Sequence, residues 1–95
     1  MTAELLFRER SALTPSSFVE IVVWHVPVPV RGSAHRFKYR LAFVADGACV
    51  IRYDNEAGKG DHKHIAENEV PYRFFGIEEL LADFWKDVET WRERQ

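Results

Sequence analysis

The sequence predicts an α+β domain, in which a four-stranded antiparallel sheet is followed by one C-terminal amphipathic helix that packs on one face of the sheet. Three observations support this order of elements. Residues 18–26 are rich in β-branched side chains, residues 36–41 alternate between charged and apolar side chains, and apolar residues recur at three- and four-residue steps from Ile77 onward. A chain of 95 residues has room for one hydrophobic core, so we expect a single domain over residues 1–95.

The first two predicted strands are separated by a turn. Residues 3–11 form the first strand, although their apolar side chains alternate poorly, and residues 18–26 form the second. Residues 14–17 (TPSS) predict the turn, because proline fixes φ while serine and threonine hydroxyls bond to nearby backbone groups. Pro27 and Pro29 end the second strand, since neither has an N–H group to donate to a neighbouring strand.

The third and fourth predicted strands form a hairpin. Along residues 36–45, alternate side chains point to opposite faces of the sheet. The apolar set is Phe37, Tyr39, Leu41 and Phe43, and the basic set is Arg36, Lys38 and Arg40. Asp46-Gly47 predicts a two-residue type I′ turn, which requires positive φ at both residues. Residues 48–54 return along the third strand, and the apolar neighbours of Cys49 predict a buried, unreactive thiol.

The C-terminal helix is predicted from its apolar stripe, which consists of Ile77, Leu80, Leu81, Phe84, Val88 and Trp91. Gly76 is the expected N-cap, and Glu78 and Glu79 lie in the first turn, where the helix dipole favours negative charge. Trp24 and Trp91 are expected in the core, whereas Trp85 lies beside the stripe, partly buried or available to a partner protein.

Composition narrows the class of protein. Hydrophobic residues make up 46% of the chain, which predicts a globular core rather than disorder. The formal net charge of −2 gives no overall signal for nucleic-acid binding, although a local basic face is compatible with it. Cys49 is the only cysteine, so no internal disulfide can form, as is usual in a reducing cytoplasm. We find no signal peptide and no membrane-spanning segment, and we expect a cytoplasmic protein.

The first candidate for function is the basic stripe on the third strand, formed by Arg36, Lys38 and Arg40. Three like charges along one face repel each other unless acids or phosphates lie opposite them. In a regular two-residue hairpin Arg52 faces Leu41 and lies on the other side of the sheet. A β-bulge or a longer turn would shift the pairing and place Arg52 beside Arg40, so the sequence leaves the face of Arg52 undecided. The alternative interpretation is an ordinary solvated sheet face.

The second candidate is the stretch YDNEAGKGDHKH, residues 53–64. Histidine titrates near neutrality and a carboxylate can orient it, so this stretch predicts acid–base chemistry such as RNA strand scission, in which the 2′-hydroxyl is the nucleophile and no cofactor is needed. The catalytic candidates are His62, His64, Asp61, Glu56 and Asp54. Gly58 and Gly60 flank Lys59, as in loops whose backbone approaches an anion, so Lys59 joins Arg36, Lys38, Arg40 and Arg52 as candidate phosphate or RNA ligands.

Two alternatives to acid–base chemistry remain for this stretch. It is a polar loop with surface histidines in the simplest interpretation. Asp61, His62 and His64 are also potential metal ligands, because the H-x-H pair lies on one side of a strand, but no fourth ligand completes the set. We therefore predict no metal and no other cofactor.

Three segments together resemble the TumE family of small prokaryotic proteins: VPVPVRGSAHRFKYRLAFV, then RYDNEAGKGDHKH, then PYRFFGIEELLADFWKDVETWR. The likeness covers nearly the whole chain, and its most specific part is the run in residues 53–64. The resemblance implies the toxin of a type II toxin–antitoxin pair, with a helix-turn-helix antitoxin (TumA-like) as partner. By analogy with other toxins of this size, it implies RNA as the target.

Two functions from different classes follow. The first is an RNA-directed toxin that cleaves its target by acid–base chemistry in the 53–64 stretch. The alternative is a non-catalytic module that binds protein or RNA through the basic sheet face. A second copy of the chain is left open as a further partner.

Overall fold

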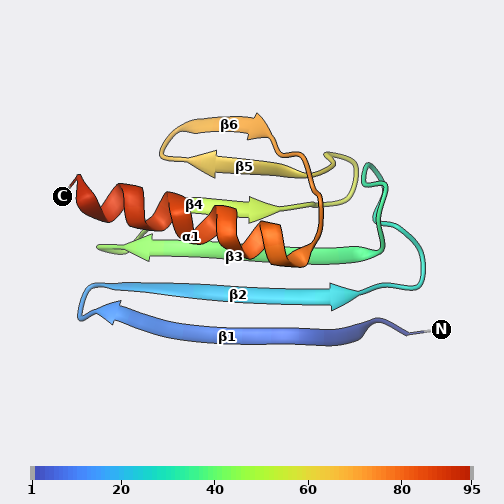
Figure 1. The fold of residues 1–95 in the computed structure, drawn as a ribbon, viewed down its shortest axis with the longest axis horizontal. Coiled ribbons are helices and arrows are strands. Elements are labelled where there is room, and N and C mark those ends of the chain that lie inside the picture. Colours follow the sequence, from blue (N-terminus) through green and yellow to red (C-terminus); the bar gives the residue numbers. More distant parts are fainter. Residues whose placement is uncertain (1, 95) are drawn as a thin grey trace.

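Six strands and one helix make up the protein in the computed structural model, which describes residues 2–94. They are β1 (Glu4–Thr14), β2 (Ser17–His25), β3 (Phe37–Ala45), β4 (Ala48–Asp54), β5 (His62–Ile65), β6 (Asn68–Pro71) and α1 (Ile77–Glu93). The strands lie side by side in sequence order and each neighbouring pair is antiparallel (Figure 1). The α+β class and the C-terminal helix are confirmed, but the predicted count of four strands is wrong by two.

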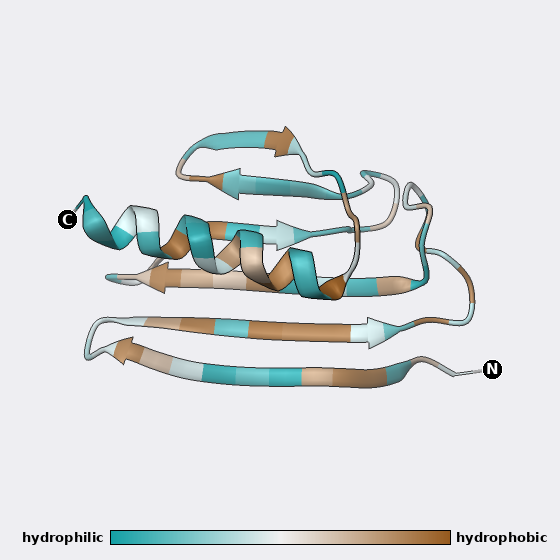
Figure 2. Cartoon of the chain, in the orientation of Figure 1, coloured by the Kyte–Doolittle hydropathy of each residue, from teal (hydrophilic) through white to brown (hydrophobic). Residues whose placement is uncertain are grey.

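The two extra strands, β5 and β6, are short and polar. Each has four residues, and all four residues of β6 are exposed. Neither carries the alternation that marks a half-buried strand, and β5 and β6 are largely hydrophilic beside the apolar runs of β2 and β3 (Figure 2). The turn between them gave no glycine signal either, because Ala66 adopts the positive φ of 56° there. The end of the predicted polar stretch, from His62 onward, is therefore a strand, which adds β5 to the sheet beside β4.

A β-bulge in the β3–β4 hairpin decides which face the β4 side chains occupy. Asp46 and Gly47 have φ values of 52° and 78°, so the predicted type I′ turn is confirmed. Val44 pairs with Cys49, but Phe43 pairs with Ile51, so one extra residue is accommodated in β4. The bulge separates Cys49 from the core residues of β4 and leaves it exposed, so the prediction of a buried thiol is wrong.

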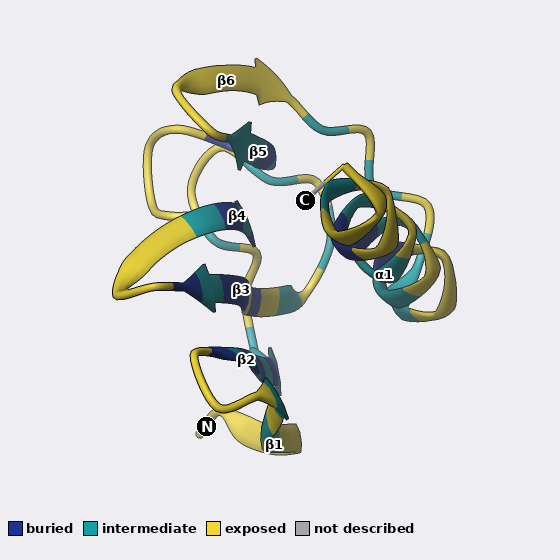
Figure 3. Ribbon diagram, turned by 90° about the vertical axis from the view of Figure 1, so that its left-hand side faces the viewer, coloured by how far each residue is buried: buried dark blue, intermediate teal, exposed yellow. Residues whose placement is uncertain are grey.

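The hydrophobic core lies between one face of the sheet and α1. Its fully buried members from the helix are Leu80, Phe84 and Val88, and those from the sheet include Val19, Ile21, Val23, Leu41, Phe43, Ile51 and Tyr53. Tyr53 also ties the layers together, because its hydroxyl donates to the Asp87 carboxylate on α1. Figure 3 shows α1 on one side of the sheet only. We call the opposite side the helix-free face.

Two helix predictions hold in detail. Gly76 is the N-cap, and Glu78 and Glu79 lie in the first turn. Trp91 is partly buried and packs edge-on against Phe43 at 5.3 Å between ring centroids. Trp24 is different: it lies outside the core cluster, so its assignment to the core is wrong. No helix in the described part of the chain is both long and apolar enough to span a membrane.

Candidate functional site

The polar side chains of β3, β4 and β5 meet on the helix-free face. Because of the bulge, Ala42 pairs with Arg52 and Arg40 pairs with Asp54, so Arg52 lies on the same face as the basic stripe. Arg52 in turn pairs with His64, and Asp54 with His62. The register therefore brings the predicted histidines beside one predicted acid and the predicted arginines.

Asp54 lies between His62 and Arg52. His62 Nε2 is 2.7 Å from Asp54 Oδ1, and Arg52 Nε is 3.1 Å from Asp54 Oδ2. His62 Nδ1 is 3.0 Å from the Gly60 carbonyl oxygen and therefore donates to it. Both ring nitrogens of His62 thus lie close to oxygen atoms of the protein.

These short distances do not all correspond to hydrogen bonds. His62 Nε2, Asp54 Oδ1 and Arg52 Nε are buried and lack a partner at hydrogen-bond geometry, although their charges lie within ion-pair distance. The His62 side chain is only 6% exposed. The Arg52 guanidinium attracts the Asp54 carboxylate, while the three atoms without a hydrogen-bond partner leave hydrogen-bonding capacity unused.

His64 has two competing partners for one nitrogen. Its Nε2 is 2.8 Å from Arg52 Nη2 and 2.7 Å from Glu69 Oε2 on β6. An arginine nitrogen can only donate and a carboxylate can only accept, so His64 Nε2 accepts from Arg52 when it carries no proton and donates to Glu69 when it carries one. Both states of this histidine have a partner in place, as a general base that gains and loses a proton requires. We call Arg52, Asp54, His62, His64 and Glu69 the histidine cluster.

A hollow of about 330 Å³ opens beside the histidine cluster. Its lining residues are Lys38, Tyr39, Arg40, Arg52, Asp54, Asn55 and Glu56. Five of these are predicted site residues, so the structure brings three of the predicted cations (Lys38, Arg40 and Arg52) and two of the candidate acids to one depression. Asn55 fixes the backbone at one side of this hollow. Its side chain accepts from the Tyr39 N–H and donates to the Phe37 carbonyl, which extends the β3–β4 pairing beyond the end of β4.

Three predicted site residues lie elsewhere. Lys59 and Arg36 are exposed, and neither lines this hollow. Asp61 is directed away from the histidine cluster, toward the end of the sheet. Its carboxylate accepts hydrogen bonds from the Ser33 hydroxyl at 2.6 Å, from His35 Nε2 at 2.7 Å and from the Tyr39 hydroxyl at 2.7 Å.

The Asp61 carboxylate therefore orients His35, not His62 or His64. His35 Nδ1 accepts the Phe37 N–H, so the ring proton lies on Nε2 and the contact with Asp61 is a hydrogen bond of a neutral ring. The ring also stacks on Phe74 at 3.8 Å between centroids. Burial opposes ionisation of Asp61, but the hydrogen bonds from Ser33, Tyr39 and His35 outweigh it and lower the pKa of this carboxyl below its ordinary value of 3.8.

The two glycines around Lys59 pack a loop and do not form an anion cradle. The Gly58 N–H donates to the Arg31 carbonyl and the Lys59 N–H donates to the Glu56 carbonyl, so these two groups are already used. A Cβ at Gly60 would lie 2.9 Å from the Gly32 oxygen, and one at Gly32 would lie 2.7 Å from the Gly60 nitrogen. Glycine is required here because two loop backbones touch.

We expect Gly60→Ala to destabilise the fold more than Gly47→Ala, which is the matched control. Both residues have positive φ, of 74° and 78°, and this costs alanine about 1–2 kcal/mol at either position. Only at Gly60 does the new methyl group meet backbone, which adds about 1–3 kcal/mol of overpacking. Urea unfolding of both variants measures the difference, and equal losses would contradict the close approach of the two loops.

Glu69 changes the metal interpretation. His62, His64 and Glu69 place ligand atoms within 4.8 Å of one another, whereas Asp61, the predicted third ligand, has other partners. The Arg52 guanidinium lies 2.8 Å from His64 Nε2, close to where a cation on that nitrogen would lie. Like charge at this point disfavours a metal site, and the arrangement fits acid–base chemistry better.

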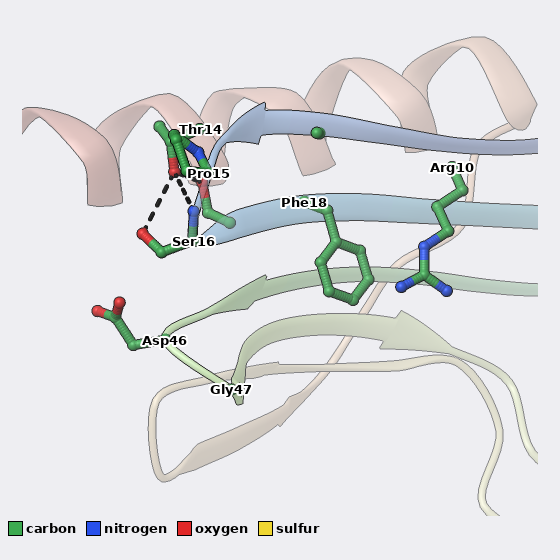
Figure 4. A pocket seen from close by; sticks show the side chains of 9 residues that line it. Arg10, Thr14, Pro15, Ser16, Phe18, Asp46 and Gly47 are labelled. Atoms are coloured by element: carbon green, nitrogen blue, oxygen red, sulfur yellow. Dashed lines mark hydrogen bonds between the residues drawn. The ribbon is translucent and has the colours of Figure 1, made fainter.

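A larger hollow, of about 610 Å³, lies at the other end of the sheet, between the β1–β2 and β3–β4 turns (Figure 4). Its hydroxyl groups bond to one another, as Thr14 Oγ1 does with Ser17 Oγ at 2.7 Å. The Arg10 guanidinium covers the Phe18 ring at 4.2 Å. Among the described residues, no histidine lines either hollow. The smaller hollow is the better candidate for chemistry because its lining residue Asp54 lies 2.7 Å from His62, whereas the one described acid that lines the larger hollow is Asp46.

Sequence reasoning missed Glu69, Asn55 and His35. Glu69 joins the site only because β6 pairs with β5, and the polar β6 sequence gave no strand signal. His35 precedes the third strand and is separated from Asp61 by 26 positions, so no local spacing connects them. Asn55 was visible only as part of the Y-D-N-E run.

Comparison with known proteins gives one result. The model of a protein family described as Toxin TumE matches residues 3–92, nearly the whole chain. No curated protein and no solved structure matches it.

Proposed function

Because the chain belongs to the TumE toxin family, we propose that it arrests growth by cleaving RNA, through acid–base chemistry at the histidine cluster that needs no metal ion. The observation that carries the proposal is the position of His64 between a fixed donor and a fixed acceptor, beside a hollow lined by Lys38, Arg40 and Arg52. The sequence resemblance adds a helix-turn-helix antitoxin as the partner that neutralises it in the cytoplasm.

The proposed reaction uses the 2′-hydroxyl of the RNA itself. The hydrogen bond from Arg52 to His64 is first released, and His64 then takes the proton of this hydroxyl. The imidazolium form of His64 donates to Glu69. The 2′-oxygen attacks phosphorus and forms a new P–O bond, and the P–O5′ bond breaks. The leaving 5′-oxygen receives a proton from the imidazolium form of His62, whose Nε2 lies 2.7 Å from Asp54, and Asp54 lines the hollow.

The cations around the hollow serve the phosphate. Negative charge grows on the phosphate oxygens as the attacking oxygen adds, and fixed positive groups stabilise it. Lys38 and Arg40 are exposed and free to turn toward a phosphate, whereas Arg52 is held by Asp54 and His64. The contact between Arg40 and Glu20 is 3.7 Å long and largely exposed, so it competes weakly.

The second candidate function is a non-catalytic module that binds RNA or protein through the same face. The observation in its favour is that the His62 side chain is only 6% exposed, with Nδ1 bonded to a backbone carbonyl and Nε2 buried beside Asp54. In that case the ion pairs of the histidine cluster hold β4, β5 and β6 in register, and the basic residues alone carry the activity.

One experiment separates the two functions. Purified protein is incubated, with a chelator present, with a short RNA and with the same RNA carrying a single 2′-deoxy substitution at the cleaved position. We expect cleavage of the first and none of the second at that position. Lys38→Glu with Arg40→Glu should abolish cleavage, whereas Arg36→Glu, a charge reversal outside the hollow, should have little effect.

Three results would count against catalysis. RNA that stays intact while the protein still arrests growth would favour the binding module, provided that the Lys38 and Arg40 reversals remove the arrest. Cleavage that the chelator stops would return the metal interpretation with Glu69 as a ligand. RNA that is neither cut nor bound would refute both catalysis and RNA binding, and would leave protein binding as the function of this face.

A further inference from the structure

Trp24 lies on the helix-free face, next to the basic stripe. It pairs directly with Lys38 across β2 and β3, and Val22, two residues earlier on the same face, pairs with Arg40. The neighbouring residues Val19, Ile21 and Val23 point to the core on the other side. The indole is only partly buried, and among the described residues no aromatic ring contacts it.

Trp24 lines a hollow that adjoins the proposed reaction site. This second hollow has a volume of about 260 Å³ and is lined by Glu20, Val22, Trp24, Lys38, Tyr39 and Arg40. Lys38, Tyr39 and Arg40 also line the hollow beside the histidine cluster. The two hollows therefore adjoin along β3, and together we call them the Trp24 groove, which spans β2, β3 and β4. Its two ends are two strand spacings apart, about 10 Å.

The order of groups along the Trp24 groove matches one class of ligand. An aromatic surface stands at one end, two mobile cations stand in the middle, and Asp54 and Arg52 stand at the other end. Proteins bind single-stranded nucleic acids by stacking bases on aromatic side chains while cations track the phosphates. A base within a duplex is already stacked on its neighbours, so only an unpaired base can reach an indole on a sheet face.

We propose that Trp24 stacks on an unpaired base of single-stranded RNA, and that Lys38 and Arg40 hold the adjoining phosphate so that the strand runs into the reaction hollow. This inference rests on the proposed function and adds the substrate class to it. Trp24 does not take part in proton transfer; it positions the strand. Stacking has little base preference, since every base has a flat face, so the inference is for a single-strand requirement and not for a sequence motif.

The test is equilibrium binding of a short single-stranded oligonucleotide whose 2′-hydroxyls are methylated, so that it binds but cannot be cleaved. Trp24→Ala should weaken binding by about 5- to 150-fold, the range that one base–aromatic contact supplies. Trp24→Phe should keep most of the affinity, because it retains an aromatic face. Trp24→Leu, which keeps apolar cover over the strands, should lose as much as the alanine variant and guards against a folding effect.

Two controls make the result specific. Trp85→Phe changes a tryptophan that packs beside Phe84 on the helix side and should leave binding unchanged. Arg40→Gln should reduce the dependence of affinity on salt, whereas Trp24→Ala should leave that dependence unchanged, because it removes no phosphate contact.

The outcomes distinguish this inference from the proposed function. If Trp24→Ala and Trp24→Leu bind the oligonucleotide as the wild type does, the stacking role is overturned, while cleavage by the wild type keeps the proposed function intact. If a fully paired duplex binds as tightly as the single strand, the single-strand requirement is overturned. If the Trp24 variants bind the antitoxin more weakly but bind the oligonucleotide as the wild type does, Trp24 contacts the partner protein and the inference fails.

Discussion

Replacing His64 by alanine is expected to lower the rate of RNA cleavage by about 10²–10⁴-fold, the contribution of one positioned acid–base group. The variant lacks the nitrogen that alternates between Arg52 and Glu69, but it keeps the cations that line the hollow. Affinity for the methylated oligonucleotide should therefore stay within a few-fold of the wild type. Single-turnover cleavage at saturating protein measures the chemical step apart from binding.

The matched control is His25→Ala, which removes a histidine that contacts the Phe37 ring edge-on at 5.7 Å and lies outside the histidine cluster. It should cleave at the wild-type rate. Glu69→Gln tests the second partner of His64: it keeps an oxygen acceptor but removes the negative charge beside the protonated ring, so it should lower the rate of cleavage more than the affinity. Wild-type cleavage by His64→Ala would refute the assignment of His64 as the base.

Replacing Asp61 by alanine is expected to lower the free energy of unfolding by about 3 kcal/mol or more, the typical cost of removing one partner from a buried charged network. Three donors, on Ser33, His35 and Tyr39, lose their acceptor together. The Asp61 side chain is 10% exposed, so water replaces these bonds poorly. Urea unfolding at neutral pH measures the loss, and Glu67→Ala, at an exposed acid in the β5–β6 turn, is the control.

The same carboxyl predicts how stability depends on pH. Its pKa is lower in the folded state than the ordinary 3.8, so the unfolded chain binds this proton more readily. The stabilisation by Asp61 is therefore complete well above 3.8 and is lost as the pH falls through that value toward the lower folded pKa. Asp61→Asn should unfold at lower urea concentration than wild type at pH 7, and the gap should narrow at pH 3. A gap that widens in acid would contradict the assignment.

The run of residues 53–64, which most resembled the family, divides into parts with different physical roles. Tyr53 faces the core and bonds to α1, Asn55 extends the β3–β4 pairing, and the glycines let two loops touch. Asp61 fixes the loop that carries Ser33 and His35. Only Asp54, His62 and His64 of this run belong to the histidine cluster. A sequence motif of this kind contains both residues that stabilise the fold and candidate catalytic residues, and the spacing of the motif does not distinguish the two groups.

The elements with strong periodicity were predictable, and those held by pairing alone were not. Alternation along β3 and the stripe of α1 follow from burial of one face, so the residues reveal them. β5 and β6 are held by backbone bonds to their neighbours and bury few side chains, so their residues carry little signal. The face that Arg52 occupies depends on a bulge, and no residue type in the hairpin indicates a bulge. Trp24 was wrongly assigned to the core because an aromatic residue among β-branched neighbours is usually buried.

The bulge in β4 also determines where the chain can change in length. A chain without Val50 would close the hairpin in regular register, with Ile51 still opposite Phe43 and Arg52 still opposite Ala42. Loss of a residue at that position would thus leave the reactive face as it is. Loss of one residue between Ile51 and Asp54 would exchange the two faces of the strand end, turning a charge toward α1 and Tyr53 toward solvent. We therefore expect relatives of this protein to tolerate the loss of a residue at position 50 but not of one residue between Ile51 and Asp54.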